Sequence, residues 1–170
     1  MFFYAIAIHA AMAIALSGNL LTLFVFYEVL TFSTYPLVTH KGTPEAKQAG
    51  RIYLGILVTS SVVFLLFGVI SVWMLAGTLD FASGGILAGR LDPVYVPLLL
   101  GLFAFGIGKA ALMPLHRWLP AAMVAPTPVS ALLHAVAVVK AGGFSMLKIS
   151  IYVFGIEFLA TTSASARLVS

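Results

Sequence analysis

Long apolar runs alternate with short polar stretches along this chain of 170 residues. A helix that crosses a bilayer needs about 20 consecutive apolar residues. Five runs reach or approach that length: residues 1–16, 20–38, 52–76, 95–113 and 129–150. A sixth run begins at residue 151 but loses its apolar character after Ala160. The pattern predicts an all-α, polytopic transmembrane helix bundle over residues 1–160, about five to six spans that form part of a larger module. Residues 161–170 are expected to be a tail outside the membrane.

Composition supports the same class of protein. Hydrophobic residues make up 62% of the chain and charged residues only 8%, whereas about a quarter of a soluble domain is charged. So few polar groups cannot cover a soluble surface, and the chain is therefore expected to lie in a membrane. The sequence contains no cysteine, which excludes disulfides, thiolate metal sites and iron–sulfur clusters. Neither a cofactor nor a metal is predicted. The opening MFFYAIAIHA lacks a signal-peptide pattern and is expected to belong to the mature chain.

The basic residues predict an orientation in the bilayer. The net charge of +4 is small and is carried mainly by short loops, which argues against a nucleic-acid partner. Cytoplasmic loops of membrane proteins are enriched in lysine and arginine. Alternation of the spans places the expected loop 39–51 on one side, together with Arg117 and Arg167, and it places Arg90 and Lys148 on the other. The first, richer side is predicted to be cytoplasmic.

Four ionisable residues lie deep inside apolar runs. Glu28 is about 14 Å along the second run and Lys109 about 21 Å along the fourth. Lys140 is near the middle of the fifth run, with His134 about 9 Å from it along the helix axis. A charged side chain at such depth costs at least about 2.5–3.5 kcal/mol. We therefore expect these four side chains to face protein or water.

Structural explanations compete with functional ones for these residues. Glu28 and Lys109 could form an ion pair that only fixes helix register, and His134 could be a neutral packing histidine. Lys140 has no further acid at its depth, so a purely structural purpose is harder to find for it. A haem protein would need facing histidines at depth, and His134 is the one deep histidine. A retinal-type Schiff base at Lys140 would colour the protein.

A helix break is predicted directly after Lys109. Pro114, His116 and Pro120 follow it within GIGKAALMPLHRWLP. Proline removes a backbone donor and clashes with the preceding turn. Backbone groups freed at membrane depth are tolerated only where protein or a wet cavity satisfies them, and broken helices mark ion sites in many transporters. The segment is therefore expected to be a discontinuous helix near Lys109–Pro120.

These residues carry a resemblance to a known family. FVFYEVLTFSTYPLV, GTPEAKQAGRIYL and GKAALMPLHRWLPAAMVAPTPVSALLHAVAVVKAG resemble the antiporter-like membrane subunits. That family comprises the proton-translocating subunits of NADH–quinone oxidoreductase, the large subunits of multi-subunit cation/proton antiporters, and membrane-bound hydrogenase subunits. The likeness covers residues 1–159. It implies one of two inverted helix bundles, in which Glu28 pairs with Lys109 of the broken helix, and His134 and Lys140 continue a proton relay.

The resemblance also implies a setting. The expected function is proton or cation/proton translocation, without redox chemistry in this chain, as part of a multi-subunit complex in a bacterial inner membrane. The expected partners are other membrane subunits, the lipid bilayer and protons, with sodium as the other candidate ion. Family members are several times longer, so a non-pumping structural membrane fragment is the alternative expectation.

Overall fold

The computed structural model describes residues 2–110, 120, 127–131 and 138–161. These residues form helices and loops and contain no strand, which confirms the all-α fold. The labelled α-helices are α1 (Phe2–Leu16), α2 (Leu20–Val38), α3 (Pro44–Ser60), α4 (Leu66–Ala76), α5 (Val96–Gly106), α7 (Thr127–Ala131) and α8 (Val138–Ile149). Residues 156–161 are also helical. Two short π-helical stretches, η1 (Ser61–Leu65) and η6 (Ser150–Phe154), continue α3 and α8, and two 3-10 turns, η2 (Pro93–Tyr95) and η3 (Gly108–Ala110), flank α5.

The first two helices have the bounds that the apolar runs predict. Asn19 caps α2, because its side chain accepts a hydrogen bond from the Thr22 amide at 2.6 Å. The prediction of a loop over residues 39–51 is wrong for most of that range, because α3 already begins at Pro44. Thr43 caps this helix by accepting from the Ala46 amide at 3.2 Å, and proline favours the first helical turn. Because the cap lies at Thr43, the polar, basic residues that follow it are helical.

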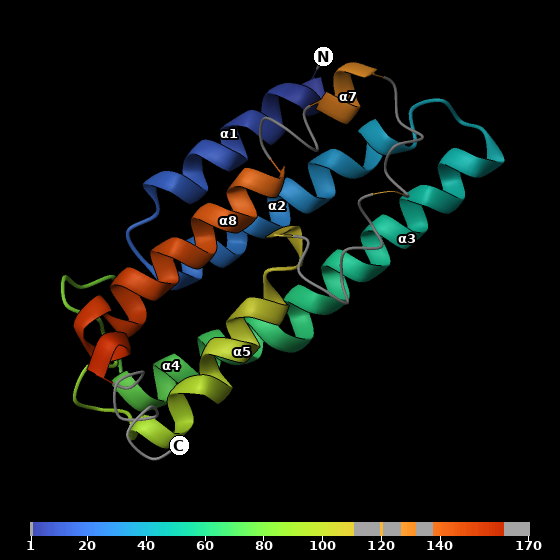
Figure 1. Cartoon of the computed structure of the whole chain (residues 1–170). Helices are drawn as coiled ribbons and strands as arrows, with labels where there is room; N and C mark the ends of the chain where they lie inside the picture. The colour runs from blue at the N-terminus through green and yellow to red at the C-terminus, as the bar shows by residue number, and fades with distance from the viewer. Residues whose placement is uncertain (1, 111–119, 121–126, 132–137, 162–170) are drawn as a thin grey trace.

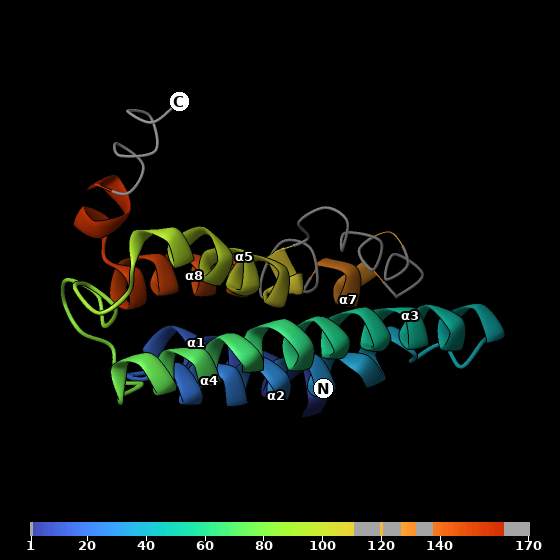
Figure 2. The same cartoon turned by 90° about the horizontal axis from the view of Figure 1, so that it is seen from below.

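The helices pack side by side in two layers. Figure 1 shows α1, α2 and the long rod formed by α3, η1 and α4 running nearly parallel to one another. In Figure 2 these helices form one layer, and α5 and α8 lie over it. The break that follows α5 therefore lies in the second layer, which packs on the first. This arrangement points Lys109 toward α2.

Fewer long spans are visible than the five that the sequence predicts. In the part of the chain that the structure describes, Leu20–Val38 and Pro44–Ala76 are long and apolar enough to cross a membrane. The helices Phe2–Leu16 and Pro93–Gly106 are shorter apolar helices. The fourth expected run does not form one helix through residue 113, because α5 ends at Gly106. The fifth run contains α7 and α8, and residues 132–137 between them lie outside the described residues.

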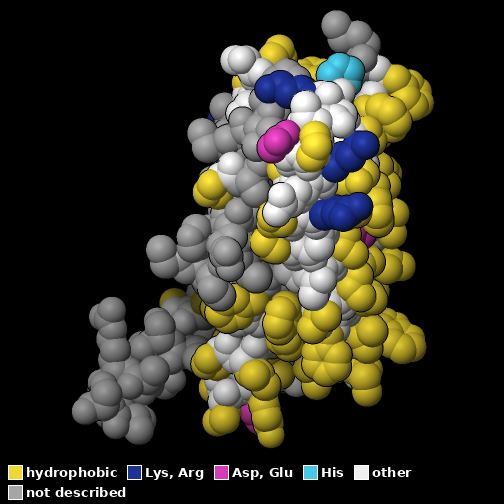
Figure 3. Space-filling model, turned by 90° about the vertical axis from the view of Figure 1, so that its right-hand side faces the viewer, with side chains coloured by type: hydrophobic (Ala, Val, Ile, Leu, Met, Phe, Trp, Pro, Cys, Tyr) yellow, Lys and Arg dark blue, Asp and Glu magenta, His cyan; other side chains and the backbone are white. Residues whose placement is uncertain are grey.

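The surface is largely apolar. On the face that Figure 3 shows, the Lys and Arg side chains gather toward one end of the molecule, and hydrophobic side chains cover much of the other described surface. Lys41 before α3 and Lys47 and Arg51 in its first half are exposed. Large apolar side chains such as Trp73 and Leu98 are also more than half exposed. A contiguous exposed apolar surface of this kind marks contact with lipid or with further helices.

Candidate functional site

The helix break lies earlier than the prolines predict. α5 ends at Gly106, and Ile107 leaves helical geometry with φ −86° and ψ 60°. A Cβ atom on Gly106 would lie 2.4 Å from the Leu65 backbone nitrogen, so the end of α5 packs backbone to backbone against the π-helical stretch η1. Pro114 and His116 lie outside the described residues, and Pro120 is exposed. The break therefore begins at a glycine contact, three residues before Lys109.

Lys109 follows the break and is completely buried. Its Nζ donates to the Tyr27 carbonyl at 2.8 Å and to Thr31 Oγ1 at 2.5 Å. The same nitrogen lies 3.2 Å from the centroid of the Tyr27 ring. Tyr27 and Thr31 belong to α2 and are themselves fully buried. The prediction that Lys109 faces protein is confirmed, and its partners on α2 are neutral groups.

Tyr27 also satisfies the backbone at the break. The Lys109 amide has no helical acceptor, because α5 ended at Gly106, and it donates instead to the Tyr27 hydroxyl at 3.0 Å. An unpaired buried amide costs about 1–3 kcal/mol. A single tyrosine side chain therefore contacts both the backbone and the ammonium group of Lys109.

Glu28 follows Tyr27 on α2 and is half-buried. Its Oε1 atom is inaccessible and has no hydrogen-bond partner. Among the described residues no ion pair within 4.0 Å joins Glu28 to a cation, although its charge acts electrostatically on Lys109. Unpaired buried oxygens of this kind are rare and call for an explanation. Glu28 and Lys109 thus approach the same interior without forming a direct ion pair in this structure.

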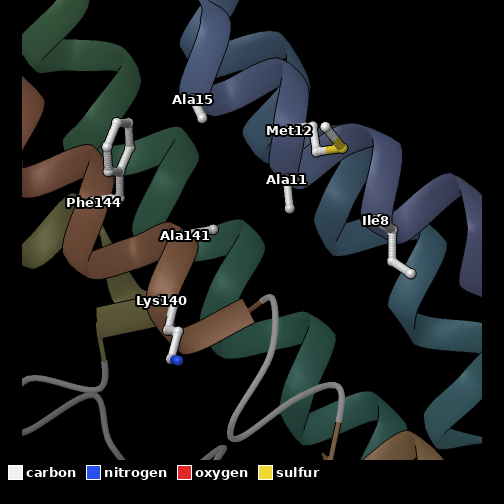
Figure 4. A pocket seen from close by; sticks show the side chains of 7 residues that line it. All are labelled: Ile8, Ala11, Met12, Ala15, Lys140, Ala141 and Phe144. Carbon is white, nitrogen blue, oxygen red and sulfur yellow. The ribbon is translucent and has the colours of Figure 1, made fainter.

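Lys140 occupies a different environment. It lies on α8 and is exposed, at the edge of a groove between α1 and α8 that is otherwise lined by apolar residues. Figure 4 shows its side chain projecting from α8, with the nitrogen directed away from the α1 side chains that line the groove. η3, which carries Lys109, packs against α8. Lys109 and Lys140 therefore lie on neighbouring elements, whereas His134 lies outside the described residues.

Lys148 is buried, although the sequence analysis used it only to predict the orientation of the chain in the bilayer. Its Nζ donates to the carbonyls of Ala15 and Ser17 at 2.8 and 2.6 Å and to Ser17 Oγ at 3.2 Å. These groups lie at the C-terminal end of α1, where helix carbonyls lack intrahelical partners and attract cations. Arg90 similarly donates to the carbonyl of Ala76, the last residue of α4. Both basic residues therefore satisfy helix ends.

The neutral partners of Lys109 carried a weak signal in the sequence. Thr31, Ser33 and Thr34 interrupt an otherwise apolar span within two turns after Glu28. Thr34, one turn beyond Thr31, bonds the Tyr53 hydroxyl at 2.6 Å, and its other hydroxyl bonds go to the carbonyls of Leu30 and Thr31. Polar side chains within a span can indicate interhelical bonds, but the spacing alone does not reveal which one meets a lysine on another helix.

Comparison with known proteins defines the class. The family model described as "NADH:quinone oxidoreductase/Mrp antiporter, TM" matches residues 17–166, and the chain belongs to this family of transmembrane antiporter subunits. It is 30% identical over 156 residues to an antiporter subunit, mnhA2, of Staphylococcus epidermidis, with 86% of this chain and 19% of the relative covered. The Staphylococcus aureus mnhA2 of strain JH9 is 30% identical over 152 residues, with the same shares covered.

A solved structure gives the same assignment. The chain matches the structure of the Mrp complex from Dietzia sp. DQ12-45-1b with a TM-score of 0.78 and 28% identity, covering 92% of this chain and 17% of that chain. The chain thus spans about a fifth of the length of the curated relatives that it matches. Family membership confirms the predicted resemblance and a membrane location. The relatives are subunits of multi-subunit complexes.

The groups around Lys109 surround one titratable amine. An amine at a helix break, in the buried interior, has neutral acceptors on one side and an acidic residue with an unpartnered oxygen nearby. Charges in such surroundings interact strongly, at about 4 kcal/mol for a pair at 4 Å and an effective dielectric constant of about 20. A small displacement between lysine and carboxylate therefore changes substantially how tightly the lysine holds its proton.

Proposed function

We propose that this chain is a proton-translocating bundle of a multi-subunit cation/proton antiporter of the Mrp type, with several spans in a bacterial inner membrane. The observation that carries the proposal is the fully buried Lys109 at a helix break, next to Glu28 with its unpartnered buried oxygen. A protein that did not need these charges would be more stable with apolar residues at both positions. The relatives named for antiporter subunits support this function over the respiratory-complex one.

The proposed path begins at Glu28 and Lys109. When Glu28 is close to Lys109, it strengthens proton binding by the lysine, and when it is distant, burial of the amine weakens that binding. Lys109 then passes its proton through water to His134 and on to Lys140. The packing of η3 against α8 supports this order, because it brings the element of Lys109 to the helix that carries Lys140. The exported or exchanged ion is a proton, with sodium as the counter-ion in the antiporter setting.

The test replaces the two lysines separately in the complete antiporter assembly that contains this chain. Lys109→Met and Lys140→Met keep side-chain volume and remove the titrating group. We expect each variant to lower proton transport at least tenfold at normal expression, measured in inverted vesicles with a pH-sensitive dye. His9→Leu is the control, because His9 is exposed and, within the described part of the chain, its ring bonds its own helix at the Ala5 carbonyl. Normal transport by both lysine variants would leave the chain a structural membrane segment.

A further inference from the structure

Among the described residues, the groups that hold the Lys109 ammonium are neutral. The carbonyl of Tyr27, the hydroxyl of Thr31 and the face of the Tyr27 ring surround its Nζ. Lys109, Tyr27 and Thr31 are all fully buried. A lysine ammonium has three donors and no acceptor, and these three groups present electron density to it from one helix, α2.

The hydrogen-bond directions around Thr31 fit a cation. The Thr31 hydroxyl donates its own proton to the Tyr27 carbonyl at 3.1 Å, so its oxygen is left to accept from Lys109. The π face of a tyrosine likewise attracts a cation that has lost its water. Tyr27 and Thr31 together therefore form a site that suits a charged lysine without supplying a negative charge.

Glu28 is the neighbouring residue on the same helix and offers the competing site. Its buried Oε1 is unpartnered while Lys109 is held by Tyr27 and Thr31. We propose that Tyr27 and Thr31 form a second holding place for the Lys109 ammonium, and that the lysine alternates between this neutral place and the Glu28 carboxylate. This inference rests on the proposed proton-transport function and adds two positioning residues to it.

The neutral place lowers the cost of separating the pair. A buried charge that loses its partner without gaining new hydrogen bonds is strongly destabilising. Lys109 avoids that penalty, because it finds an oriented carbonyl and hydroxyl when it leaves Glu28. The released carboxylate is then free to act on another cation. Without Thr31, the lysine should remain with Glu28, and each transport cycle should become slower.

The experiment compares two buried threonines of α2 in the complete assembly. Thr31→Val keeps shape and removes the hydroxyl that binds Lys109. Thr34→Val makes the same change one turn away, where the hydroxyl bonds Tyr53 instead. We expect Thr31→Val to slow proton transport about fivefold or more, Thr31→Ser to restore it, and Thr34→Val to remain within about twofold of wild type.

A structural readout separates positioning from general damage. Electron cryo-microscopy of the Thr31→Val assembly should show Lys109 Nζ within about 4 Å of the Glu28 carboxylate, whereas the Thr34→Val assembly should keep Nζ at Tyr27. Equal transport in the two valine variants, or an unmoved Nζ in Thr31→Val, would overturn the neutral holding place. If Lys109→Met transports normally as well, the proposed function itself fails. If Lys109→Met is inactive while the threonine variants are equal, only the present inference fails.

Discussion

The close contact at Gly106 predicts that the helix break cannot accept even one methyl group. In Gly106→Ala the new Cβ would lie 2.4 Å from the Leu65 nitrogen and 2.7 Å from the Leu65 Cα. Both atoms belong to the backbone of η1 and cannot rotate away. Ordinary contact begins at 3.4 Å, so α5 and η1 must separate by about 1 Å. Overpacking of this kind costs about 1–3 kcal/mol.

The displacement should reach Lys109 as well. Lys109 is three residues beyond Gly106, and its bonds to the Tyr27 carbonyl, the Tyr27 hydroxyl and Thr31 span 2.8, 3.0 and 2.5 Å. A shift of about 1 Å carries most of these beyond hydrogen-bonding distance. Losing a bond from a buried charged donor adds about 1.5–3 kcal/mol. We therefore expect Gly106→Ala to lose roughly 3 kcal/mol or more of stability and most proton transport.

Gly101→Ala supplies the matched control on the same helix. A Cβ there meets no atom within 4 Å, and alanine is favoured over glycine in a helix by about 1 kcal/mol. The unfolding temperature of the detergent-solubilised assembly should therefore fall in Gly106→Ala and rise slightly in Gly101→Ala. Vesicle acidification should fall in Gly106→Ala and stay at the wild-type level in Gly101→Ala. If Gly106→Ala unfolds at the wild-type temperature and transports protons normally, the backbone contact does not position the break, and the reasoning is wrong.

Two further substitutions test the groups that satisfy orphaned backbone atoms. Lys148→Met removes three hydrogen bonds to Ala15 and Ser17. Because helix-end carbonyls are left unpaired, the free energy of unfolding should fall by about 2–4 kcal/mol in thermal or chemical unfolding. The control Lys47→Met, at an exposed position, should lower it by less than about 0.5 kcal/mol. Tyr27→Phe keeps the ring under the ammonium but strips the Lys109 amide of its acceptor, so unfolding should become easier by about 1–3 kcal/mol. Wild-type stability of either Lys148→Met or Tyr27→Phe would show that water or another group replaces the lost partner.

Local signals in the sequence determined the class of the protein and several helix ends. The apolar runs, together with the scarcity of charge, predict an all-helical membrane protein, because a helix in lipid must satisfy its backbone within itself. Asn19 marks the start of α2 through capping, which depends on residues three apart. The depth of Lys109 in an apolar run was likewise enough to predict that its side chain faces protein or water rather than lipid. Each of these effects acts within one segment.

Tertiary structure decided where the break begins and what holds the lysine. The prolines predicted a break beyond Lys109, but α5 ends at Gly106, because a glycine backbone meets η1 of another helix there. Charge pairing predicted Glu28 as the partner of Lys109, yet the hydrogen bonds go to Tyr27 and Thr31. A backbone carbonyl has no sequence signature, and which hydroxyl meets a lysine depends on the rotation and depth of two packed helices. Those quantities exist only once the helices have assembled.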